Sequence, residues 1–394
     1  MSATSEHAAP ARTAPWNDPK IRALVSQAVV VILTVWLVWT VVSNTITNLE
    51  HRNIASGFGF LDTTAGFGII QTLIPYEEAS SYGRAFIVGL LNTLLVAFIG
   101  IIVATILGFV IGIMRLSRNW LISKIATVYI EVVRNIPLLL QIFVWYHAVL
   151  KPLPGPRDSL ELFGSVFVNN RGLYMPKPLF GPGSGFILAA FLLGCVASVL
   201  VWRWARQRQM DTGEQFPVLW TVLGLVVGLP LVALVATGVP VTFDYPELGG
   251  FNFRGGMVVI PEFTAMLFAL SIYTASFIAE IVRAGIQGVS HGQTEAAHSL
   301  GLRPGPTLRL VVIPQALRII IPPLTSQYLN LTKNSSLAVA IAYPDLVAVG
   351  GTILNQTGQA VEIIGMWMVI YLAISLATSA FMNWYNARIA LVER

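Results

Sequence analysis

Residues 85–114 read AFIVGLLNTLLVAFIGIIVATILGFVIGIM and contain no charged side chain. A helix needs roughly 20 mostly apolar residues to cross about 30 Å of hydrocarbon, so this stretch is long enough to span a bilayer. The rest of the 394-residue chain has the same character, because 55% of its residues are hydrophobic and only 11% are charged. These proportions are typical of a membrane protein and not of a water-soluble one.

Further apolar stretches approach or exceed this length, which predicts an all-α, polytopic membrane protein with about eight transmembrane helices. In chain order, the expected spans are residues 25–42, 85–114, 121–150, 185–202, 217–237, 264–286, 322–349 and 361–381. Residues 1–24 and 386–394 are expected to form polar tails. No small-residue cleavage pattern follows the first span, so we expect it to stay in the mature chain, with a loop completing residues 25–84.

The basic residues predict that both tails are cytoplasmic. Over alternate connections and the helix ends beside them, 15 Lys and Arg lie on the side of the N-terminus and seven on the other side. Positively charged residues are retained in the cytoplasm. The two long connections on the opposite side, residues 43–84 and 151–184, mix Gly, Pro and aromatic residues and are expected to cap the outer face.

The composition excludes several classes of function. A net charge of +5 is too weak for a nucleic-acid binder, so no nucleic-acid partner is expected. The single cysteine, Cys195, cannot form an intramolecular disulfide or a multi-cysteine metal site. No lysine follows a glycine as in a phosphate-binding loop, and the histidines offer no pair of haem ligands within the spans. We therefore predict no catalytic residue, no metal site and no cofactor bound by this chain.

The longest cytoplasmic connection runs from about residue 283 to residue 323 and reads RAGIQGVSHGQTEAAHSLGLRPGPTLRLVVIPQALRIIIPP. We expect a short helix from Thr294 that ends at Gly301 in a left-handed conformation. The next residues, Arg303-Pro304-Gly305-Pro306, predict a stiff turn, and Thr307 is expected to cap a second short helix that ends at Pro314. Two short helices around a rigid turn would form a compact knob.

Seven residues of this loop have the spacing of a known signature. They are Glu295, Ala296, Ala297, Gly301, Val311, Ile313 and Pro314. The loop resembles the cytoplasmic coupling loop of permease subunits in bacterial ATP-binding-cassette importers. That loop has Glu-Ala-Ala, three residues, Gly, nine residues, an aliphatic residue, one residue, a second aliphatic residue and Pro. Here Val and Ile replace the usual Ile and Leu. An ordinary pair of surface helices is the alternative interpretation.

Three other segments are similar to the amino-acid branch of this family, the polar and general L-amino-acid importer permeases of Gram-negative bacteria. They are GLLNT at residues 89–93, EVVRNIPLLLQ at residues 131–141 and NLTKNSSL at residues 330–337. The resemblance implies an importer transmembrane domain over residues 85–385. Its five-helix core would be supplemented by the N-terminal helix and by a helical hairpin inserted at about residues 185–237. The coupling loop is expected at about residues 287–322.

The resemblance also implies partners and a mechanism. Such a permease lies in the bacterial inner membrane with a second permease subunit, expected to be a different chain, and with two ATP-binding-cassette ATPase subunits that hold ATP and Mg. A periplasmic amino-acid-binding protein delivers the solute, and L-amino acids cross by alternating access. The alternative is a secondary transporter driven by an ion gradient, but the sequence shows neither inverted repeats nor matched broken helices. A membrane-bound enzyme ranks below both.

Polar residues within the expected seventh span mark a candidate solute pathway. A charge at mid-bilayer costs at least about 2.5 kcal/mol and normally faces protein or a cavity. Gln327, Asn330 and Asn334 share one helical face, with Lys333 and Ser335 beside them. Amide, hydroxyl and ammonium groups suit the carboxylate and amine of an amino acid. We expect this face to line a cavity or a polar subunit interface, and Lys333 alternatively pairs with an acid of the other permease.

The third span adds Arg134 and Gln141 to the candidate pathway, because both share a helical face with Glu131. This span is longer than a bilayer requires. Its first third is expected to lie along the inner interface before Asn135 and Pro137 turn it upward. Glu131 and Arg134 then form either an ion pair that braces the bend or contacts to the solute.

Glu280 and Arg283 lie near the end of the sixth span, where the coupling loop begins. Residues three apart on a helix are neighbours on its surface. We therefore expect an ion pair between them, with a gate as the alternative role.

Overall fold

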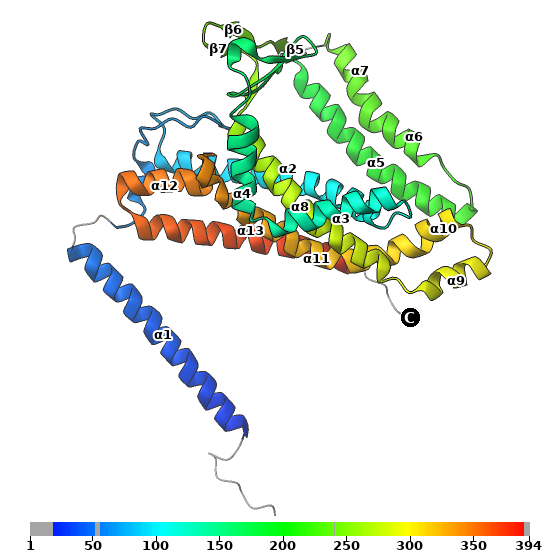
Figure 1. Cartoon of the computed structure of the whole chain (residues 1–394), viewed down its shortest axis with the longest axis horizontal. Coiled ribbons are helices and arrows are strands. Elements are labelled where there is room, and N and C mark those ends of the chain that lie inside the picture. The colour runs from blue at the N-terminus through cyan, green and yellow to red at the C-terminus, as the bar shows by residue number, and fades with distance from the viewer. Residues whose placement is uncertain (1–18, 52–55, 240, 390–394) are drawn as a thin grey trace, which may run out of the picture.

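The computed structural model describes residues 19–51, 56–239 and 241–389. Within these residues, seven helices are long and apolar enough to cross a membrane, and a bent helix pair supplies an eighth candidate span. Figure 1 shows a largely helical molecule with a small region of strands near its top. The prediction of an all-α, polytopic fold with about eight spans is confirmed for the membrane part. Of the predicted tails, residues 1–18 and 390–394 lie outside the described residues.

Most long helices extend beyond the predicted spans, because the apolar stretch marks only the part of a helix that suits hydrocarbon. The long helices are α1 Pro19–His51, α2 Tyr82–Arg115, α3 Trp120–Asn135, α5 Ser184–Thr212, α8 Pro261–Gln287, α11 Ile313–Asn334 and α13 Ala360–Ile389. The shorter helices are α4 Leu138–Phe143, α6 Val218–Leu223, α7 Leu229–Ala236, α9 His291–Ser299, α10 Pro304–Thr307 and α12 Leu346–Thr357. Short 3₁₀ helices are η2 Gly59–Asp62, η4 Pro156–Asp158 and η7 Ser335–Ile341.

Helices α2 and α8 form the centre of the bundle through small residues. On α2, Gly100, Ala104, Gly108 and Gly112 recur at every fourth position and are all buried. A Cβ atom at Gly108 would lie 2.5 Å from Ile278 Cγ2, so the backbones of the two helices approach closely there. Small residues spaced four apart commonly line the contact between two membrane helices. Because lipid supplies no hydrophobic force between helices, their association depends on the close packing that small residues allow.

Three π-helical segments occur within the described residues, and each precedes a proline. They are η3 Val144–Leu150, η5 Gly224–Gly228 and η6 Leu308–Val312. Pro152, Pro230 and Pro314 each follow two residues after the end of such a segment. Pro230 and Pro314 lie within helices α7 and α11, where a proline has no N–H to donate and its ring clashes with the carbonyl four residues earlier, which in both cases lies within the π segment; Pro152 follows the end of its helix. The wider π turn relieves that clash.

The predicted third span is bent at the expected place. Helix α3 ends at Asn135, and the following helix axis turns by 105°. Ile136 is extended, as is usual for a residue before proline, and Pro137 precedes α4. The bend divides the span about midway, so the segment before it is longer than the predicted first third.

The predicted seventh span, residues 322–349, is wrong in both of its limits. Helix α11 begins at Ile313 and passes through Pro322 and Pro323. Prolines are tolerated within membrane helices, because neighbouring helices and local adjustments satisfy the carbonyls that they leave free. The chain then continues as η7, which ends at Ile341 and is followed by Ala342, whose φ is +58°. A separate helix, α12, follows, and the sequence analysis does not anticipate it.

Eight short strands lie in the connections at residues 160–180 and 241–259; the sequence analysis expects an outer cap over the first of these connections and predicts no strands in either. A four-stranded antiparallel sheet has the order β1-β2-β3-β8, and β4 pairs with β5 and β6 with β7. The strands are β1 Leu160–Leu162, β2 Val166–Asn169, β3 Gly172–Met175, β4 Lys177–Phe180, β5 Val241–Asp244, β6 Glu247–Gly249, β7 Asn252–Arg254 and β8 Met257–Val259. Phe167 of β2 and Phe253 of β7 stack with ring centroids 4.6 Å apart, and this contact connects the four-stranded sheet to the β6–β7 pair.

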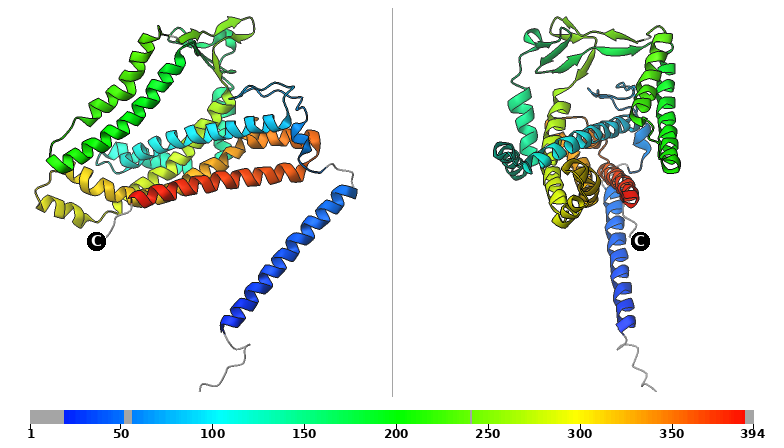
Figure 2. Two further views of the ribbon diagram at one scale, coloured as in Figure 1. Left: turned by 180° about the vertical axis from the view of Figure 1, so that it is seen from behind. Right: turned by 90° about the vertical axis from the view of Figure 1, so that its right-hand side faces the viewer.

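The hairpin of α5, α6 and α7 is inserted between β4 and β5, so these two paired strands close its base. A Cβ atom at Gly194 of α5 would lie 2.2 Å from the Leu225 carbonyl oxygen, which shows that the two arms touch. Figures 1 and 2 show the hairpin as an arm beside the bundle, and α1 points away from it. The division into an importer core with an added N-terminal helix and an inserted hairpin stays a prediction.

Candidate functional site

The Glu-Ala-Ala signature lies on α9, which projects beyond the bundle with α10 (Figure 1). Gly301 has a φ of +79°, as predicted. The Gly301 N–H donates to the His298 carbonyl at 2.9 Å, and the Leu302 N–H donates to the Ala297 carbonyl at 3.1 Å. These two bonds form a Schellman motif, which satisfies the last carbonyls of the helix. Glycine suits this position because it adopts the left-handed conformation without strain.

The second half of the loop differs from its prediction. The expected turn at residues 303–306 and the expected Thr307 cap are wrong, because α10 already begins at Pro304. Proline is favoured at a first helical position, where no N–H is needed. The Thr307 hydroxyl instead donates to the Arg303 carbonyl at 3.0 Å. The helix also does not stop at Pro314, since the chain continues from η6, which contains Val311, into α11, which begins with Ile313 and Pro314.

One side of α9 faces the protein and the other is exposed, with the Glu295 carboxylate 3.0 Å from His291 one turn earlier on the same helix. Ala297 is buried, and Gln315 of α11 donates to the Gln293 side chain at 3.2 Å. Ala296 and Glu295 are exposed. Leu300 is 82% exposed, a high value for a large apolar side chain. The signature helix therefore presents a small-residue and apolar surface away from the bundle.

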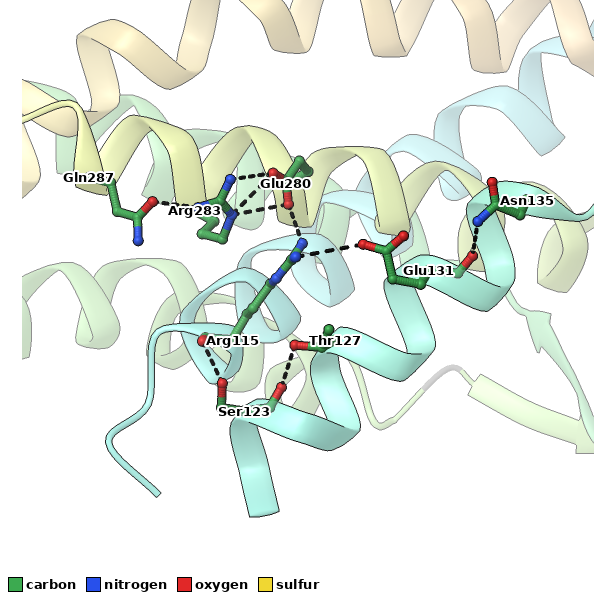
Figure 3. A network of polar contacts seen from close by, with 8 residues as sticks. All are labelled: Arg115, Ser123, Thr127, Glu131, Asn135, Glu280, Arg283 and Gln287. Atoms are coloured by element: carbon green, nitrogen blue, oxygen red, sulfur yellow. Dashed lines mark hydrogen bonds and ion pairs between the residues drawn. The ribbon is translucent and has the colours of Figure 1, made fainter. Parts of the chain in front are cut away.

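A cluster of charged side chains joins three helices close to the start of this loop. We call Arg115, Glu131, Glu280, Arg283 and Gln287 the Glu280 cluster (Figure 3). The Arg115 guanidinium donates to the Glu280 carboxylate and lies 3.6 Å from the Glu131 carboxylate. Arg283 donates to both Glu280 oxygens, from Nε at 3.1 Å, and also to the Gln287 side chain. The predicted Glu280–Arg283 ion pair is present and is part of a larger network.

The predicted Glu131–Arg134 ion pair is wrong. Glu131 pairs with Arg115 of α2, because the end of α2 approaches α3 from the side. The Arg134 guanidinium lies over the Phe277 ring of α8, 4.9 Å from its centroid. The Tyr129 hydroxyl donates to the Ile272 carbonyl at 2.6 Å. Helix α3 is thus fixed to α8 by an aromatic ring and a backbone carbonyl as well as through Arg115.

Gln141 has a structural position at the bend between α3 and α4. Its side chain is buried, and its amide donates to the Val133 and Ile136 carbonyls, both at 2.9 Å. These carbonyls belong to the residues where the α3 hydrogen-bond ladder ends, and carbonyls at a helix end need such partners. The expected place of Gln141 in a solute pathway is not supported by this geometry.

The polar residues of the expected seventh span do not all share one environment. Asn330 and Lys333 are exposed on α11, and Gln327 and Asn334 are partly exposed. Ser335 is fully buried, and its hydroxyl donates to the Thr332 carbonyl at 2.7 Å. Four of the five residues therefore remain accessible from outside the chain, whereas Ser335 does not.

The structure adds a buried polar contact between α2 and α12 that the sequence analysis missed. Asn92 donates to the Gln71 and Pro344 carbonyls at 2.9 Å, and the Leu346 N–H donates to Thr93 at 2.9 Å. Asp345 caps α12 by accepting from the Ala348 N–H at 2.8 Å. Burial raises the pKa of the Asp345 carboxyl to about 7. An aspartate directly before an apolar run is a helix-start signal that would have indicated α12.

The described residues contain no group of three or more His, Cys, Asp or Glu side chains that could hold a metal ion. The polar contacts found at the loop and on α3 are hydrogen bonds and ion pairs between helices. They include contacts between helices that lie far apart in the sequence.

Comparison with known proteins agrees with the loop signature. Residues 104–391 match the family model of the binding-protein-dependent transport system inner membrane component. The general L-amino acid transport system permease protein AapQ of Rhizobium johnstonii is 59% identical over 377 residues, which cover 96% of this chain and 94% of that protein. The glutamate/glutamine/aspartate/asparagine transport system permease protein BztB of Rhodobacter capsulatus is 46% identical over 410 residues, which cover 96% of each chain.

A solved structure described as an amino acid ABC transporter with histidines is 23% identical and aligns with a TM-score of 0.47, covering 78% of this chain and 95% of that chain. The family match begins within α2 and extends through α13, so it includes the signature helix and the polar face of α11. The family match and the sequence relatives give no support to the alternative of a secondary transporter. The chain belongs to the family of binding-protein-dependent transport system inner membrane components, the permease family that its loop signature indicates.

Proposed function

We propose that this chain is the permease subunit of an ATP-driven amino-acid importer and forms a pathway for L-amino acids across the bacterial inner membrane by alternating access. The names of the relatives support amino acids as the solute class. The observation that carries the proposal is the exposed face of α9, where the signature residues Glu295 and Ala296 face outward while Ala297 packs inward.

The same face defines the ATPase contact. Two ATP-binding-cassette ATPase subunits, which hold ATP and Mg, each receive a coupling helix of one permease subunit in a surface groove. Ala296 lets the groove approach the helix backbone closely, and the 82% exposed Leu300 supplies an apolar anchor. A second permease subunit, expected to be a different chain, completes the pathway, and a periplasmic amino-acid-binding protein delivers the solute. This chain itself holds no cofactor.

The proposed orientation places both termini and the coupling loop, residues 287–322, in the cytoplasm. The excess of Lys and Arg on that side supports it. The strands then lie on the periplasmic side, and residues 85–385 form the importer domain with the inserted hairpin at residues 185–237. In a Cys195→Ala background, Ser165→Cys should react with an impermeant thiol reagent added to sealed cells, and Ser299→Cys should not. The opposite labelling would reverse the orientation.

The proposed solute pathway contains fewer residues than the sequence alone indicates. Asn330 and Asn334 lie one turn apart on an accessible face of α11, with Gln327 and Lys333 beside them. These groups can exchange hydrogen bonds with the carboxylate and amine of an amino acid. Ser335, Gln141 and Arg134 are assigned to the scaffold, because their polar groups already contact backbone carbonyls or an aromatic ring.

Reversing the charge of Glu295 tests the coupling assignment. In the assembled transporter in proteoliposomes, Glu295→Lys should leave assembly and basal ATP hydrolysis intact and abolish the stimulation by solute-loaded binding protein. Asp211→Lys, an exposed charge reversal at the end of α5, is the matched control and should retain full stimulation. Normal stimulation in Glu295→Lys would contradict the assignment of α9 as the coupling helix.

A further inference from the structure

The Glu280 cluster lies where the bundle passes into the signature loop. Arg115 is the last residue of α2, and Gln287 is the last residue of α8. Glu280 accepts from Arg115 and Arg283, and Arg283 also donates to Gln287 (Figure 3). Only three residues separate Gln287 from the start of α9 at His291. An unbroken series of hydrogen bonds therefore runs from the end of α2 to the connection that carries α9.

The charged side chains at the centre of the cluster are partly buried, so the loss of any one of them would be costly. The side chains of Arg115, Glu280 and Arg283 are only 19%, 27% and 28% exposed. Charged hydrogen bonds in such partly buried sites are less screened than surface pairs, and removing one partner leaves the others uncompensated. Without the Glu280 charge, Arg115 and Arg283 would face each other without their shared acceptor. Glu131, which is 57% exposed, contributes less.

The packing around the cluster differs between its two sides. On the bundle side, a Cβ atom at Gly112 would lie 2.7 Å from the Ala279 carbonyl oxygen, so α2 and α8 are in close backbone contact. On the loop side, an apolar cavity of about 510 Å³ lies between Met114, Ile122, Ile286 and Leu308. Closely packed contacts move as units, whereas a cavity leaves room for displacement. The loop can thus shift beside α2 and α3 while the Glu280 cluster keeps the end of α8 attached to them.

We propose that Glu280 is a positioning residue that transmits movement of α9 to α2 and α3 through Arg115. The proposal rests on the assignment of α9 as the ATPase-coupling helix. ATPase closure displaces α9, the end of α8 follows, and Glu280 carries the ends of α2 and α3 with it. The bend of α3 and the contacts of Tyr129 and Arg134 with α8 make α3 follow the same movement.

A double-mutant cycle tests the proposal. Glu280→Gln, Arg115→Gln and the double variant are assembled with their partner subunits in proteoliposomes, and the ratio of solute-stimulated to basal ATP hydrolysis is measured with solute uptake. Each single variant should lower the ratio on the order of tenfold, a usual size for coupling between sites. The double variant should be no worse than the single ones, because both changes break the same link.

Arg208 and Glu214 provide the matched control, since they form an ion pair at 2.6 Å near the end of the hairpin, outside the bundle. Arg208→Gln with Glu214→Gln should leave the ratio unchanged. A ratio in Glu280→Gln equal to that of the wild type, with a lower unfolding midpoint, would overturn the proposal, because Glu280 would then act only in stability. Additive effects of the two single changes would also overturn it.

The outcome for Glu295→Lys separates this proposal from the proposed function. If Glu295→Lys abolishes stimulation and Glu280→Gln does not lower it, the transmission role is wrong and the coupling loop stands. If neither change lowers stimulation, the proposed function fails. If Glu280→Gln does not assemble, Glu280→Asp is tested instead. This variant keeps the negative charge, but its side chain is one methylene shorter, so the carboxylate lies farther from Arg115 and Arg283. A several-fold lower ratio in that variant supports the proposal, and an unchanged ratio contradicts it.

Discussion

Replacing Gly112 with alanine tests how closely α2 and α8 approach. A Cβ atom at this position would lie 2.7 Å from the Ala279 carbonyl oxygen and 2.8 Å from the Val282 Cβ. Heavy atoms in favourable contact lie about 3.5 Å apart, so the helices must separate by roughly 0.7 Å or more at this point. Neither neighbour can rotate away, because one is a backbone atom and the other is the branch point of a stiff side chain.

The magnitude follows from two opposing effects. Overpacking a close contact costs about 1–3 kcal/mol, and rigid neighbours place Gly112→Ala in the upper half of that range. Alanine offsets up to about 1 kcal/mol, because it is a better helix former than glycine. We expect a net decrease of about 1–2 kcal/mol in the free energy of unfolding and a larger decrease for Gly112→Leu.

The assay is denaturation of the assembled transporter by SDS in detergent micelles, followed by circular dichroism. Gly365→Ala on α13 is the matched control, because a Cβ atom there would meet no atom within 4 Å. That variant should be as stable as the wild type or slightly more stable. An unfolding midpoint for Gly112→Ala equal to that of Gly365→Ala would refute the close packing of α2 against α8.

Gly301→Ala should weaken the end of α9 by about 1 kcal/mol, because its Cβ would meet no neighbour and only the positive φ is strained. We expect this variant to show less solute-stimulated ATP hydrolysis with an unchanged unfolding midpoint. A lower midpoint would contradict an effect confined to the end of α9. Gln141→Leu removes the donor of two carbonyls, at up to about 1–3 kcal/mol each, and should lower the unfolding midpoint. The preference of this variant among amino acids in uptake should not change. A changed preference would indicate that Gln141 contacts the solute. Asn334→Leu should lower uptake or alter the preference among amino acids while basal ATP hydrolysis continues. Ala189→Leu on the exposed side of α5 should leave uptake unchanged, and equal uptake by these two variants would contradict a pathway along α11.

Features that depend on local chemistry were predictable from the sequence. The spans follow from the length of apolar runs, because each helix must satisfy its own backbone in lipid. The bend after Asn135 follows from Pro137, and the positive φ of Gly301 follows from its place after a short helix. In each case the decisive groups lie within a few residues of one another in the chain.

Features that depend on distant partners were not predictable. Glu131 has Arg134 one turn away on its own helix, yet it pairs with Arg115, which the fold brings from α2. Strands β4 and β5 pair although the whole hairpin lies between them in the sequence. Pro322 and Pro323 were expected near the start of a span, but the prolines lie inside α11 because the surrounding helices support it. Spacing along one helix identifies a shared face and does not identify what covers that face.

The position of α8 explains why one helix can link the two ends of the molecule. It begins directly after β8 and ends three residues before α9, and its 27 residues correspond to a length of about 40 Å. At its first turn, the Tyr146 hydroxyl donates to Glu262 at 2.6 Å, and at its far end Glu280 holds Arg115. Between these points, the small residues of α2 keep the two helices in contact. Under the proposed coupling role of α9, helix α8, which is anchored at both ends, would carry a movement of α9 toward the strand region.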